Sequence, residues 1–387
     1  MPQDPLLLTE QERILQRAVH DFADNVLAPR AGELDEREEF PWENFRGLAD
    51  MGLLGIGVPE AYGGAGGGFR ESSIATEEIA RGCAATSVIY GAHLSLATQT
   101  IARFGSDALK ARFLPALAQG RRVAAFALTE PEAGSDVASL ATAVTRKGDD
   151  YVLNGSKLFI TNGDVASVYV VFATHDRALR TKGIDCLVLE KGTPGLAANR
   201  QSGKLGMRAS STAEVVFQDA AVPVENRIGE EGTGFYAAMQ ILESSRITIA
   251  AQCAGIAQAC LEAAARYAGR RHAFGQPIAG FQAIQWMLAD TAVEVDAARL
   301  LTRRAAVLKD MGLPHGTESA MAKLFASEAA NRAADRAVQV HGGYGYFRGA
   351  PVERYFRDAR VTEIYEGTSE VQRLIISRAV LQALASQ

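Results

Sequence analysis

The sequence predicts an α+β protein in which a helical part, a β part and a bundle of long helices follow one another. Apolar residues keep a helical period up to about residue 122, short β-type runs bounded by turns occupy the next hundred residues, and the helical period then returns. A chain of 387 residues is long enough for two or three domains at about 150 residues each. We therefore expect an N-terminal all-α domain at 1–122, a β domain at 123–231 and a helical bundle at 232–387.

Local signals define the helices of the N-terminal domain. Residues Thr9 to Glu12 form a capping-box pattern, and the apolar side chains after them fall on one stripe of a helix. Further helices are expected at about 72–81, 87–104 and 107–118. The glycine-rich run 63–68 lacks the Gly-Lys-Ser/Thr ending of a phosphate-binding loop, so we interpret it as a flexible connector.

The middle domain is predicted from its spacing of short strands. The β-type runs lie at 123–128, 151–153, 158–160, 168–173, 184–189 and 215–217. Asn154-Gly155, between two of these runs, predicts a tight hairpin. Six or more short strands without helices between them indicate a small antiparallel barrel or a sandwich, and we predict the antiparallel β-barrel.

Long helices predict a four-helix bundle in the C-terminal domain. The first carries apolar residues in steps of three and four from Phe235 to Cys260, and Arg246 falls on the same stripe. An unpaired charge there would be costly, so Arg246 is either a snorkelling side chain or the partner of a ligand or an internal carboxylate. Helices are also expected at about 282–309 and 318–340, the second of which ends at a Gly-Gly pair.

Composition narrows the class of partner. A net charge of -5 gives no electrostatic reason to expect nucleic acid or an anionic membrane. The four cysteines form no Cys-x-x-Cys pair, which argues against a disulfide framework or a metal site and fits a reducing compartment. We recognise no signal peptide and no apolar stretch long enough to span a bilayer. These observations predict a soluble intracellular protein without a membrane or nucleic-acid partner.

Five motifs hold the residues that could carry chemistry. They lie at 126–136, 157–163, 271–277, 339–345 and 364–370. The first could present backbone N–H groups and hydroxyls to a planar ligand, or could be a turn that ends a strand. The third offers a guanidinium suited to phosphate. The fifth is a break between two helices, where the carboxylate of Glu366 can point into a pocket.

Together, in this order and spacing, the motifs resemble the acyl-CoA dehydrogenase family across nearly the whole chain. The matching patterns are Thr-Glu-Pro-x-Ala-Gly-Ser-Asp, Ile-Thr-Asn-Gly, Arg-x-x-Phe-Gly, Gln-x-His-Gly-Gly-x-Gly and Glu-Ile-Tyr-Glu-Gly-Thr-Ser-Glu. The three-part architecture expected above is similar to the fold of that family. The resemblance implies a flavoprotein of fatty acid metabolism, such as β-oxidation.

The resemblance also implies that FAD is bound by residues from all three domains. The implied cofactor-binding residues are Phe126, Leu128, Thr129, Gly134, Ser135, Phe159, Thr161, Arg271, Phe274, Gln282, Gln339, Gly342, Gly343, Thr368 and Glu370. Many relatives have Trp where this chain has Phe159. Arg271, Phe274 and Gln282 would hold the pyrophosphate and adenosine. The run 339–343 would reach the FAD of a neighbouring subunit, which implies a homotetramer.

The implied reaction is α,β-dehydrogenation of an acyl-CoA thioester to the trans-2-enoyl-CoA. Glu366 would remove the α-proton, flavin N5 would accept the β-hydride, and electron transfer flavoprotein would take the electrons. The implied substrate-binding residues are Ser135, Glu243, Arg246, Tyr365 and Gly367. Glu243 stands where the family pattern has Asp, which leaves its nucleotide contact open. Branches of the family that carry their base on the earlier helix place it at the position of Ser245, which cannot act as a carboxylate base.

Several alternatives remain open at this stage. The same fold hosts acyl-CoA oxidases, nitroalkane oxidases and flavin-dependent hydroxylases, and a catalytically silent binding member or a DNA-associated relative is a further possibility. The acyl group is also open, because pocket depth depends on how residues 94–98 and 239–245 pack. The expected location is the cytoplasm of a bacterium, or the mitochondrial matrix of a eukaryote.

Overall fold

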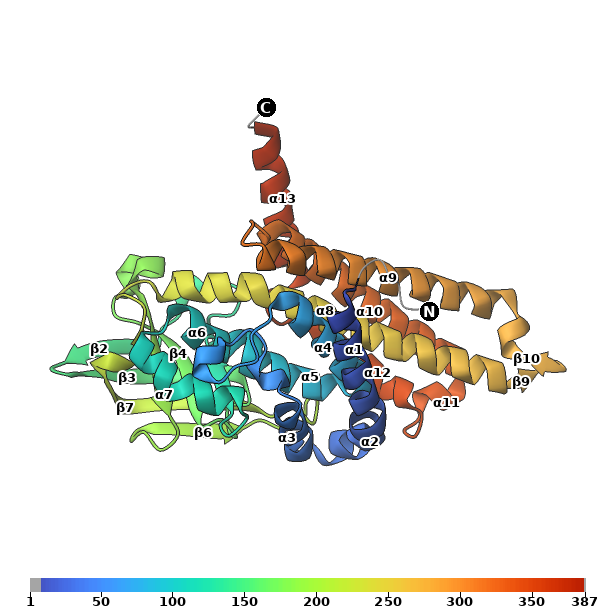
Figure 1. Ribbon diagram of the computed structural model, residues 1–387, viewed down its shortest axis with the longest axis horizontal. Coiled ribbons are helices and arrows are strands. Elements are labelled where there is room, and N and C mark those ends of the chain that lie inside the picture. Colours follow the sequence, from blue (N-terminus) through green and yellow to red (C-terminus); the bar gives the residue numbers. More distant parts are fainter. Residues whose placement is uncertain (1–7, 386–387) are drawn as a thin grey trace.

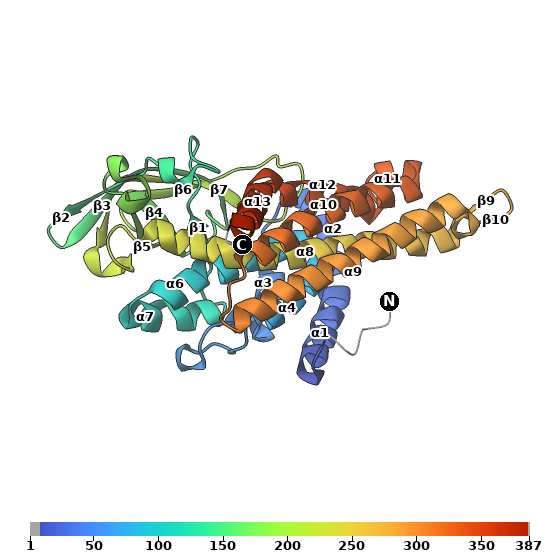
Figure 2. The same cartoon turned by 90° about the horizontal axis from the view of Figure 1, so that it is seen from above.

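The computed structural model describes residues 8–385, and it places the β domain at one end and long helices at the other (Figure 1). The first residues of the N-terminus, on which the signal-peptide prediction partly rests, lie outside this range. Helix α8 (Gly234–Arg270) runs through both regions, as the view from above also shows (Figure 2). The last helix, α13 (Ser369–Ala385), projects from the body of the molecule (Figure 1).

The N-terminal part is helical, as predicted. Its elements are α1 (Glu10–Phe22), η1 (Ala23–Leu27), α2 (Ala28–Arg37), α3 (Trp42–Asp50), η2 (Leu53–Gly55), η3 (Glu60–Tyr62), α4 (Phe69–Gly82), α5 (Ala84–Gly91), η4 (Ala92–Thr98), α6 (Gln99–Phe104) and α7 (Asp107–Ala118). The predicted capping box is confirmed, because the Thr9 hydroxyl accepts from the backbone N–H of Glu12 and the Glu12 carboxylate accepts from that of Thr9. The helix expected at 87–104 is instead three segments, and the middle one, η4, is a π-helix.

Helix α4 begins earlier than its sequence pattern indicates, because its first N–H groups find distant partners. The Asp310 carboxylate accepts from Phe69 N at 2.7 Å and from Arg70 N at 2.9 Å. Glu71 accepts from Gly68 N at 2.8 Å. A carboxylate at a helix N-terminus satisfies orphan donors and complements the helix dipole, so this tertiary contact adds a turn to the helix.

The middle domain is built on one eight-stranded sheet with the order β6-β7-β3-β2-β4-β5-β8 and with β1 beside β4. Its strands are β1 (Ala124–Ala127), β2 (Ala143–Lys147), β3 (Asp150–Thr161), β4 (Val168–Thr174), β5 (Ile184–Glu190), β6 (Leu196–Arg200), β7 (Thr212–Pro223) and β8 (Arg227–Ile228). Most neighbours are antiparallel, as predicted, but β1 and β2 each pair with β4 in parallel.

The predicted Asn154-Gly155 hairpin is wrong. Both residues lie inside the continuous strand β3, at a register shift against β7. Gly155 has φ +143, and the Asn154 amide exchanges hydrogen bonds of 3.0 and 2.9 Å with Asp219 on β7. The pair therefore forms an irregularity that two strands share. The turn lies instead at Gly148-Asp149, between Lys147 and Asp150, which pair across β2 and β3.

Strand β4 joins the two hydrophobic cores. Val168, Val170 and Phe172 face the core shared with the helices, whereas the alternate residues Tyr169 and Val171 face the core of the β domain. All seven residues of β4 are buried. The sheet is thus packed on both faces at this strand, which fixes the β domain against the helices that carry the candidate site.

The C-terminal part is a bundle around α8, which packs on α4, α9 (Gln282–Asp310) and α10 (Gly316–His341). Between α8 and α9 lie β9 (His272–Ala273), β10 (Gln276–Pro277) and η8 (Ile278–Gly280). After α10 come α11 (Gly343–Tyr346), α12 (Pro351–Arg360) and η9 (Val361–Glu363). Gly342 follows α10 with φ +56, in agreement with the predicted glycine stop.

The prediction that no apolar stretch is long enough to span a bilayer is wrong for α8. By length and composition this helix of 37 residues could cross a membrane, although 83% of its most apolar window is buried inside the protein. Its apolar residues are therefore explained by its place at the centre of the bundle. All four cysteines are free and buried, and residues 8–385 contain no group of three or more His, Cys, Asp or Glu side chains that could hold a metal ion.

Candidate active site

Glu366 lies in the predicted break between two helical segments, η9 and α13. It has φ +51 and Gly367 has φ +93, so both residues adopt the left-handed conformation that few non-glycine residues occupy. The backbone N–H groups of Ile364 and Tyr365 both donate to Val361 O, at 2.9 and 3.1 Å. The break is therefore a defined turn.

The Glu366 carboxylate points toward α8. Its Oε2 accepts a hydrogen bond from the Ser245 hydroxyl, and the charges of Lys323 and Arg246 act on it. Burial raises the pKa of Glu366 above its ordinary value, while the Ser245 hydrogen bond and the two cations oppose that shift. Burial is thus the dominant influence, which suits a carboxylate that takes up a proton.

Arg246 carries an unsatisfied donor next to this carboxylate. Among the described residues, its Nε is buried and has no hydrogen-bond partner. Burial lowers the pKa of the Arg246 guanidinium, and the charges of Glu243 and Glu366 counteract this. An orphaned, buried N–H donor is costly in a finished core. Its presence favours the interpretation that Arg246 meets a ligand over that of a snorkelling side chain.

Glu243 lies one helical turn before Arg246 and faces a basic surface. The charge of Glu243 acts on Arg103 and Lys309, and burial lowers the pKa of both cations. Arg103 also donates to Gln240 Oε1 at 2.9 Å. The structure therefore places the two residues of the predicted Glu-x-x-Arg pair between this basic group and Glu366.

A chain of hydrogen bonds connects the Glu366 loop with the β domain. The Tyr365 hydroxyl donates to Gln252 Oε1, so it is directed into the core. Gln252 Nε2 in turn donates to Ser87 Oγ on α5 at 2.7 Å. Two residues further along α5, Asn162 of the Ile-Thr-Asn-Gly motif donates to Ile89 O at 3.2 Å. Helix α5 thus links the fifth motif to the second.

The first two motifs lie side by side in the β domain. Leu158 N donates to Thr129 O at 2.8 Å, and Lys157 Nζ donates to Leu128 O at 3.1 Å and to Glu130 Oε1 at 2.6 Å. Lys157 is fully buried, and burial lowers its pKa to about 8. This buried pair fixes the start of the loop that holds Gly134 and Ser135, both of which are exposed.

Side-chain directions divide the predicted flavin-facing residues. Phe126 and Leu128 are buried in the helical core, with the Phe126 ring 4.9 Å from that of Phe172. Only their backbones could therefore contact a cofactor. Phe159, by contrast, is 66% exposed with φ +59, and the half-buried Thr161 pairs with Thr212. An exposed aromatic ring held in a strained conformation on a strand fits a planar partner such as a flavin ring.

A second group of predicted residues gathers at the far end of α8. A cavity of about 450 Å³ there is lined by Ala263, Arg266, Tyr267, Arg270, Arg271, His341, Tyr344 and Pro351. The cavity brings Arg271 of the third motif together with His341 and Tyr344 of the fourth. Arg271 lies 5.8 Å from the Tyr344 ring centre, and three arginines with two tyrosines suit a pyrophosphate and an aromatic base. Phe274, Gln282, Gln339, Gly342 and Gly343 are all exposed, with Phe274 at 95%.

The Glu366 group and the Arg271 group of predicted residues lie far apart along α8. Arg246 and Arg271 are 25 positions apart along α8, and the helical rise of about 1.5 Å per residue separates them by about 37 Å. Thr368 and Glu370 belong to the Glu366 group. Thr368 is half-buried and its hydroxyl accepts from Val371 N at 3.4 Å, whereas Glu370 is exposed.

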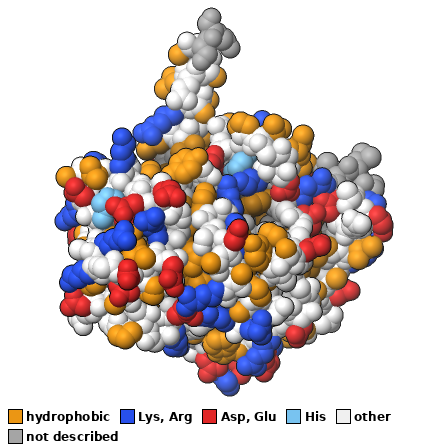
Figure 3. All heavy atoms as spheres, turned by 60° about the vertical axis from the view of Figure 1, so that its left-hand side comes forward, with side chains coloured by type: hydrophobic (Ala, Val, Ile, Leu, Met, Phe, Trp, Pro, Cys, Tyr) orange, Lys and Arg blue, Asp and Glu red, His pale blue; other side chains and the backbone are white. Residues whose placement is uncertain are grey.

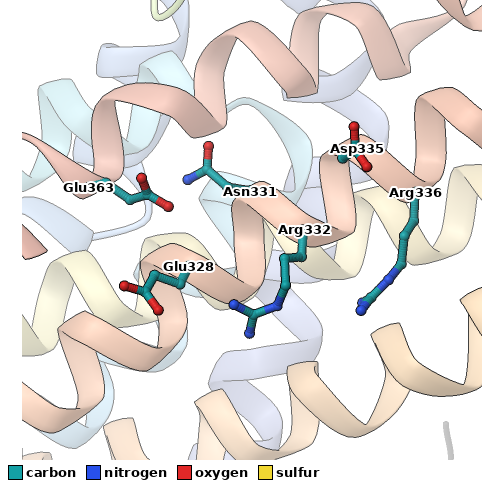
Figure 4. Close-up of a pocket in the computed structure, with 6 residues that line it drawn as sticks. All are labelled: Glu328, Asn331, Arg332, Asp335, Arg336 and Glu363. Atoms are coloured by element: carbon teal, nitrogen blue, oxygen red, sulfur yellow. The ribbon is translucent and has the colours of Figure 1, made fainter.

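A third surface feature contains none of the predicted residues. Glu328, Asn331, Arg332, Asp335, Arg336 and Glu363 line a cavity of about 580 Å³ along α10 (Figure 4). Arg332 and Arg336 both pair with Glu294 on α9, at 2.8 and 2.7 Å. Because its arginines already have partners, this cavity adds no group to the candidate site.

Comparison with known proteins identifies the chain. Residues 9–121, 125–220 and 232–381 match the N-terminal, middle and C-terminal domains of acyl-CoA dehydrogenase. The chain belongs to the acyl-CoA dehydrogenase family. Members are FAD-dependent oxidoreductases, so this chain is a flavoenzyme that dehydrogenates an acyl-CoA. The predicted family, fold class, enzyme class and cofactor are confirmed.

The similarity extends over whole proteins. The mitochondrial short-chain specific acyl-CoA dehydrogenase of Rattus norvegicus is 48% identical over 98% of this chain and 92% of its own. The butyryl-CoA dehydrogenase structure from Megasphaera elsdenii has a TM-score of 0.95 and 42% identity, and covers 98% of this chain and 100% of its own. A chain from a structural study of the electron transferring flavoprotein of Acidaminococcus fermentans has a TM-score of 0.95 and 43% identity, with 97% and 98% covered.

Sequence reasoning missed residues that surround Glu366. From the sequence, Ser245 indicates only the absence of a base on the earlier helix, and the five motifs include neither Lys323 nor Gln372. Lys323 is a charged residue on the alanine-rich stripe of α10, where it is fully buried. The rule that singled out Arg246, a charge on an apolar stripe, applies equally to Lys323.

Proposed function

We propose that Glu366 is the base of this acyl-CoA dehydrogenase and that its substrate is a short-chain acyl-CoA. The observation that supports this proposal best is the half-buried Glu366 carboxylate, held in a strained turn beside the unsatisfied Nε of Arg246. A carboxylate with a pKa raised by burial is a stronger base toward a weakly acidic α-proton.

The protein contributes position and charge to the reaction. FAD supplies the hydride acceptor. Glu366 takes the α-proton on its carboxylate, and its backbone N–H is a suitable donor to the thioester oxygen as negative charge develops there. Arg246 meets the substrate with its free donor. Phe159 and the loop from Thr129 to Ser135 form the face that receives the flavin.

Replacing Glu366 with Gln tests the base. Glu366→Gln keeps the size and polarity of the side chain, so bound FAD and its visible absorbance should be unchanged. Turnover should fall by about 10²–10⁴, the usual contribution of a positioned base. Stopped-flow reduction of the flavin by butyryl-CoA measures the step directly. Near wild-type reduction would remove Glu366 from the mechanism.

The close packing of η4 on α8 supports a short acyl chain. Residues 94–98 of η4 are all buried, and Ser95 Oγ lies 3.0 Å from Thr248 Oγ1 on α8. This contact joins η4 to α8 half a turn beyond Arg246. The short-chain and butyryl-CoA enzymes among the relatives support the same conclusion. Comparing kcat/KM for butyryl-, hexanoyl-, octanoyl- and isobutyryl-CoA tests it, and a maximum at octanoyl-CoA would refute it.

Electron transfer flavoprotein is the proposed electron acceptor, supported by the relative found in a study of that protein. Rapid reoxidation of the reduced enzyme by oxygen would favour an oxidase instead. The proposed location is the bacterial cytoplasm, or the mitochondrial matrix in a eukaryote, since relatives from both sources match.

The proposed assembly is a homotetramer in which neighbouring chains share each FAD. The separation of about 37 Å along α8 supports this, because the Arg271 end of one chain would serve the Glu366 end of another. The projecting helix α13 also carries exposed apolar side chains, among them Leu374, Leu381 and Leu384. Figure 3 shows hydrophobic side chains on this helix above a body where acidic and basic side chains intermix. Light scattering of the holoenzyme measures the mass of the assembly.

A further inference from the structure

A second cation is buried beside the Glu366 turn. Lys323 on α10 is fully buried, and its Nζ donates to the carbonyl oxygen of Gly367 at 2.7 Å. Within residues 8–385, no carboxylate forms an ion pair with Lys323 at 4 Å or less. A buried ammonium group without a paired carboxylate is costly, so its retention at this place requires an explanation.

The same carbonyl accepts a second side-chain donor. Gln372 on α13 is also fully buried, and its Nε2 donates to Gly367 O at 2.8 Å and to Glu366 O at 3.4 Å. Two helices that approach from different directions therefore hold one peptide group. We call Lys323 and Gln372 the carbonyl clamp.

The clamp lies where the backbone is strained. A non-glycine residue in the left-handed region is held there only when its surroundings over-determine its conformation, and Glu366 has φ +51. A Cβ atom at position 367 would lie 2.6 Å from Gln372 Nε2, so only glycine allows this approach. The clamp and the glycine together account for the conformation of Glu366.

Charges reach Glu366 from two elements besides its own turn. Helix α8 contributes the Ser245 hydroxyl and the Arg246 guanidinium, and α10 contributes the Lys323 ammonium. Lys323 itself faces Cys253 on α8 and Glu363 on η9. Burial raises the pKa of Cys253 to about 12, so this thiol stays neutral and leaves Lys323 and Arg246 as the cations beside Glu366.

We propose that Lys323 and Gln372 are positioning residues for proton abstraction. Both hold the Gly367 carbonyl and so aim the Glu366 carboxylate, and Lys323 also favours the ionised carboxylate by its charge. In this step the proton moves from the substrate α-carbon to Glu366, and Lys323 neither gives nor takes it. The proposal rests on Glu366 being the base.

Three variants separate position from charge. Lys323→Met removes both a donor and a charge, Gln372→Met removes only a donor, and Lys323→Arg keeps the charge. We expect Lys323→Met and Gln372→Met to lower the rate of flavin reduction by about 10–10²-fold, as a small misplacement of a reacting group does. The KM for butyryl-CoA and the FAD content should stay close to those of the wild type.

The pH profile distinguishes the two clamp residues. Removing a nearby positive charge raises the pKa of a carboxylate, so the acid limb of kcat/KM should move to higher pH in Lys323→Met. It should stay in place in Gln372→Met and return toward the wild-type position in Lys323→Arg. Ser327→Ala, one turn along α10 at a buried hydroxyl that donates to Leu324 O at 3.2 Å, is the matched control and should leave rate and profile unchanged.

The outcomes are separable from those that test the base. A folded, FAD-loaded Lys323→Met or Gln372→Met enzyme with a wild-type reduction rate would overturn the proposal, even if its melting temperature fell. If Lys323→Met fails to fold, Gln372→Met tests position and Lys323→Arg tests charge. If Glu366 is not the base, Glu366→Gln will retain activity. The reduction rates of the Lys323 and Gln372 variants are measured separately and do not decide that question.

Discussion

At the scale of single residues, the Ser245 hydroxyl adjusts the proposed base. It donates to Glu366 Oε2, and this bond lowers the pKa of a carboxylate that burial raises. Ser245→Ala removes the donor, so the pKa of Glu366 should rise further. Because the base must be ionised, the acid limb of kcat/KM for butyryl-CoA should move to higher pH. A pH series with the purified holoenzyme measures the shift.

The adjacent serine provides the control for this prediction. Ser244 donates to Gln240 O of its own helix at 3.1 Å, so Ser244→Ala changes the same chemical group without touching Glu366. Its acid limb should coincide with that of the wild type. Coincident profiles for both variants would show that the Ser245 hydrogen bond does not influence the base.

Residues in contiguous motifs could be predicted from the sequence, whereas the residues that hold those motifs in place could not. Glu366 was found because a carboxylate in a helix break belongs to a motif that also includes Gly367. Lys323 and Gln372 lie 43 positions before and six after Glu366. The charge of Lys323 on an alanine-rich stripe is a signal for a buried cation, but it does not indicate which turn that cation contacts. Their burial depends on how α10 and α13 meet the turn, which only tertiary packing decides.

At the scale of elements, local signals succeeded and signals that depend on a partner failed. The Thr9 capping box is completed within four residues, so the sequence contains all of it. An Asn-Gly pair can form a hairpin turn or an irregularity within a strand, and the neighbouring strand determines which. Here Asp219 on β7 pairs with Asn154 and keeps β3 extended through both residues.

Gly155→Ala tests whether the irregularity in β3 requires a glycine. At φ +143 an added Cβ would lie 2.7 Å from the Thr142 Cα, so the variant should lose about 1–3 kcal/mol of unfolding free energy, as overpacked sites do. Thermal denaturation of the holoenzyme measures the loss. Gly192 also has a positive φ but has no atom within 4 Å of an added Cβ, so Gly192→Ala isolates the backbone strain. Equal losses in both variants would mean that the contact with Thr142 is unimportant.

At the scale of the whole molecule, α8 separates the two halves of the proposed FAD site. Glu366 lies beside Ser245 near the start of this helix, and Arg271 follows its last residue. If chains share their sites, each site takes Glu366 from one chain and Arg271 from another. An assembly that mixes two variant chains would then contain sites of different composition, whereas a site built within one chain would be the same as in the separate variants.

We expect two inactive variants to restore activity when they assemble together. Differently tagged Glu366→Gln and Arg271→Ala chains, co-expressed and purified through both tags, would form some sites with both defects and others with neither. The intact sites should give mixed assemblies a substantial fraction of the wild-type kcat with butyryl-CoA and full FAD spectra in those sites. Assemblies of two differently tagged Glu366→Gln chains must stay inactive. If each chain builds its own site, every site in the mixed assembly has one defect, and activity should not exceed that of the separate variants.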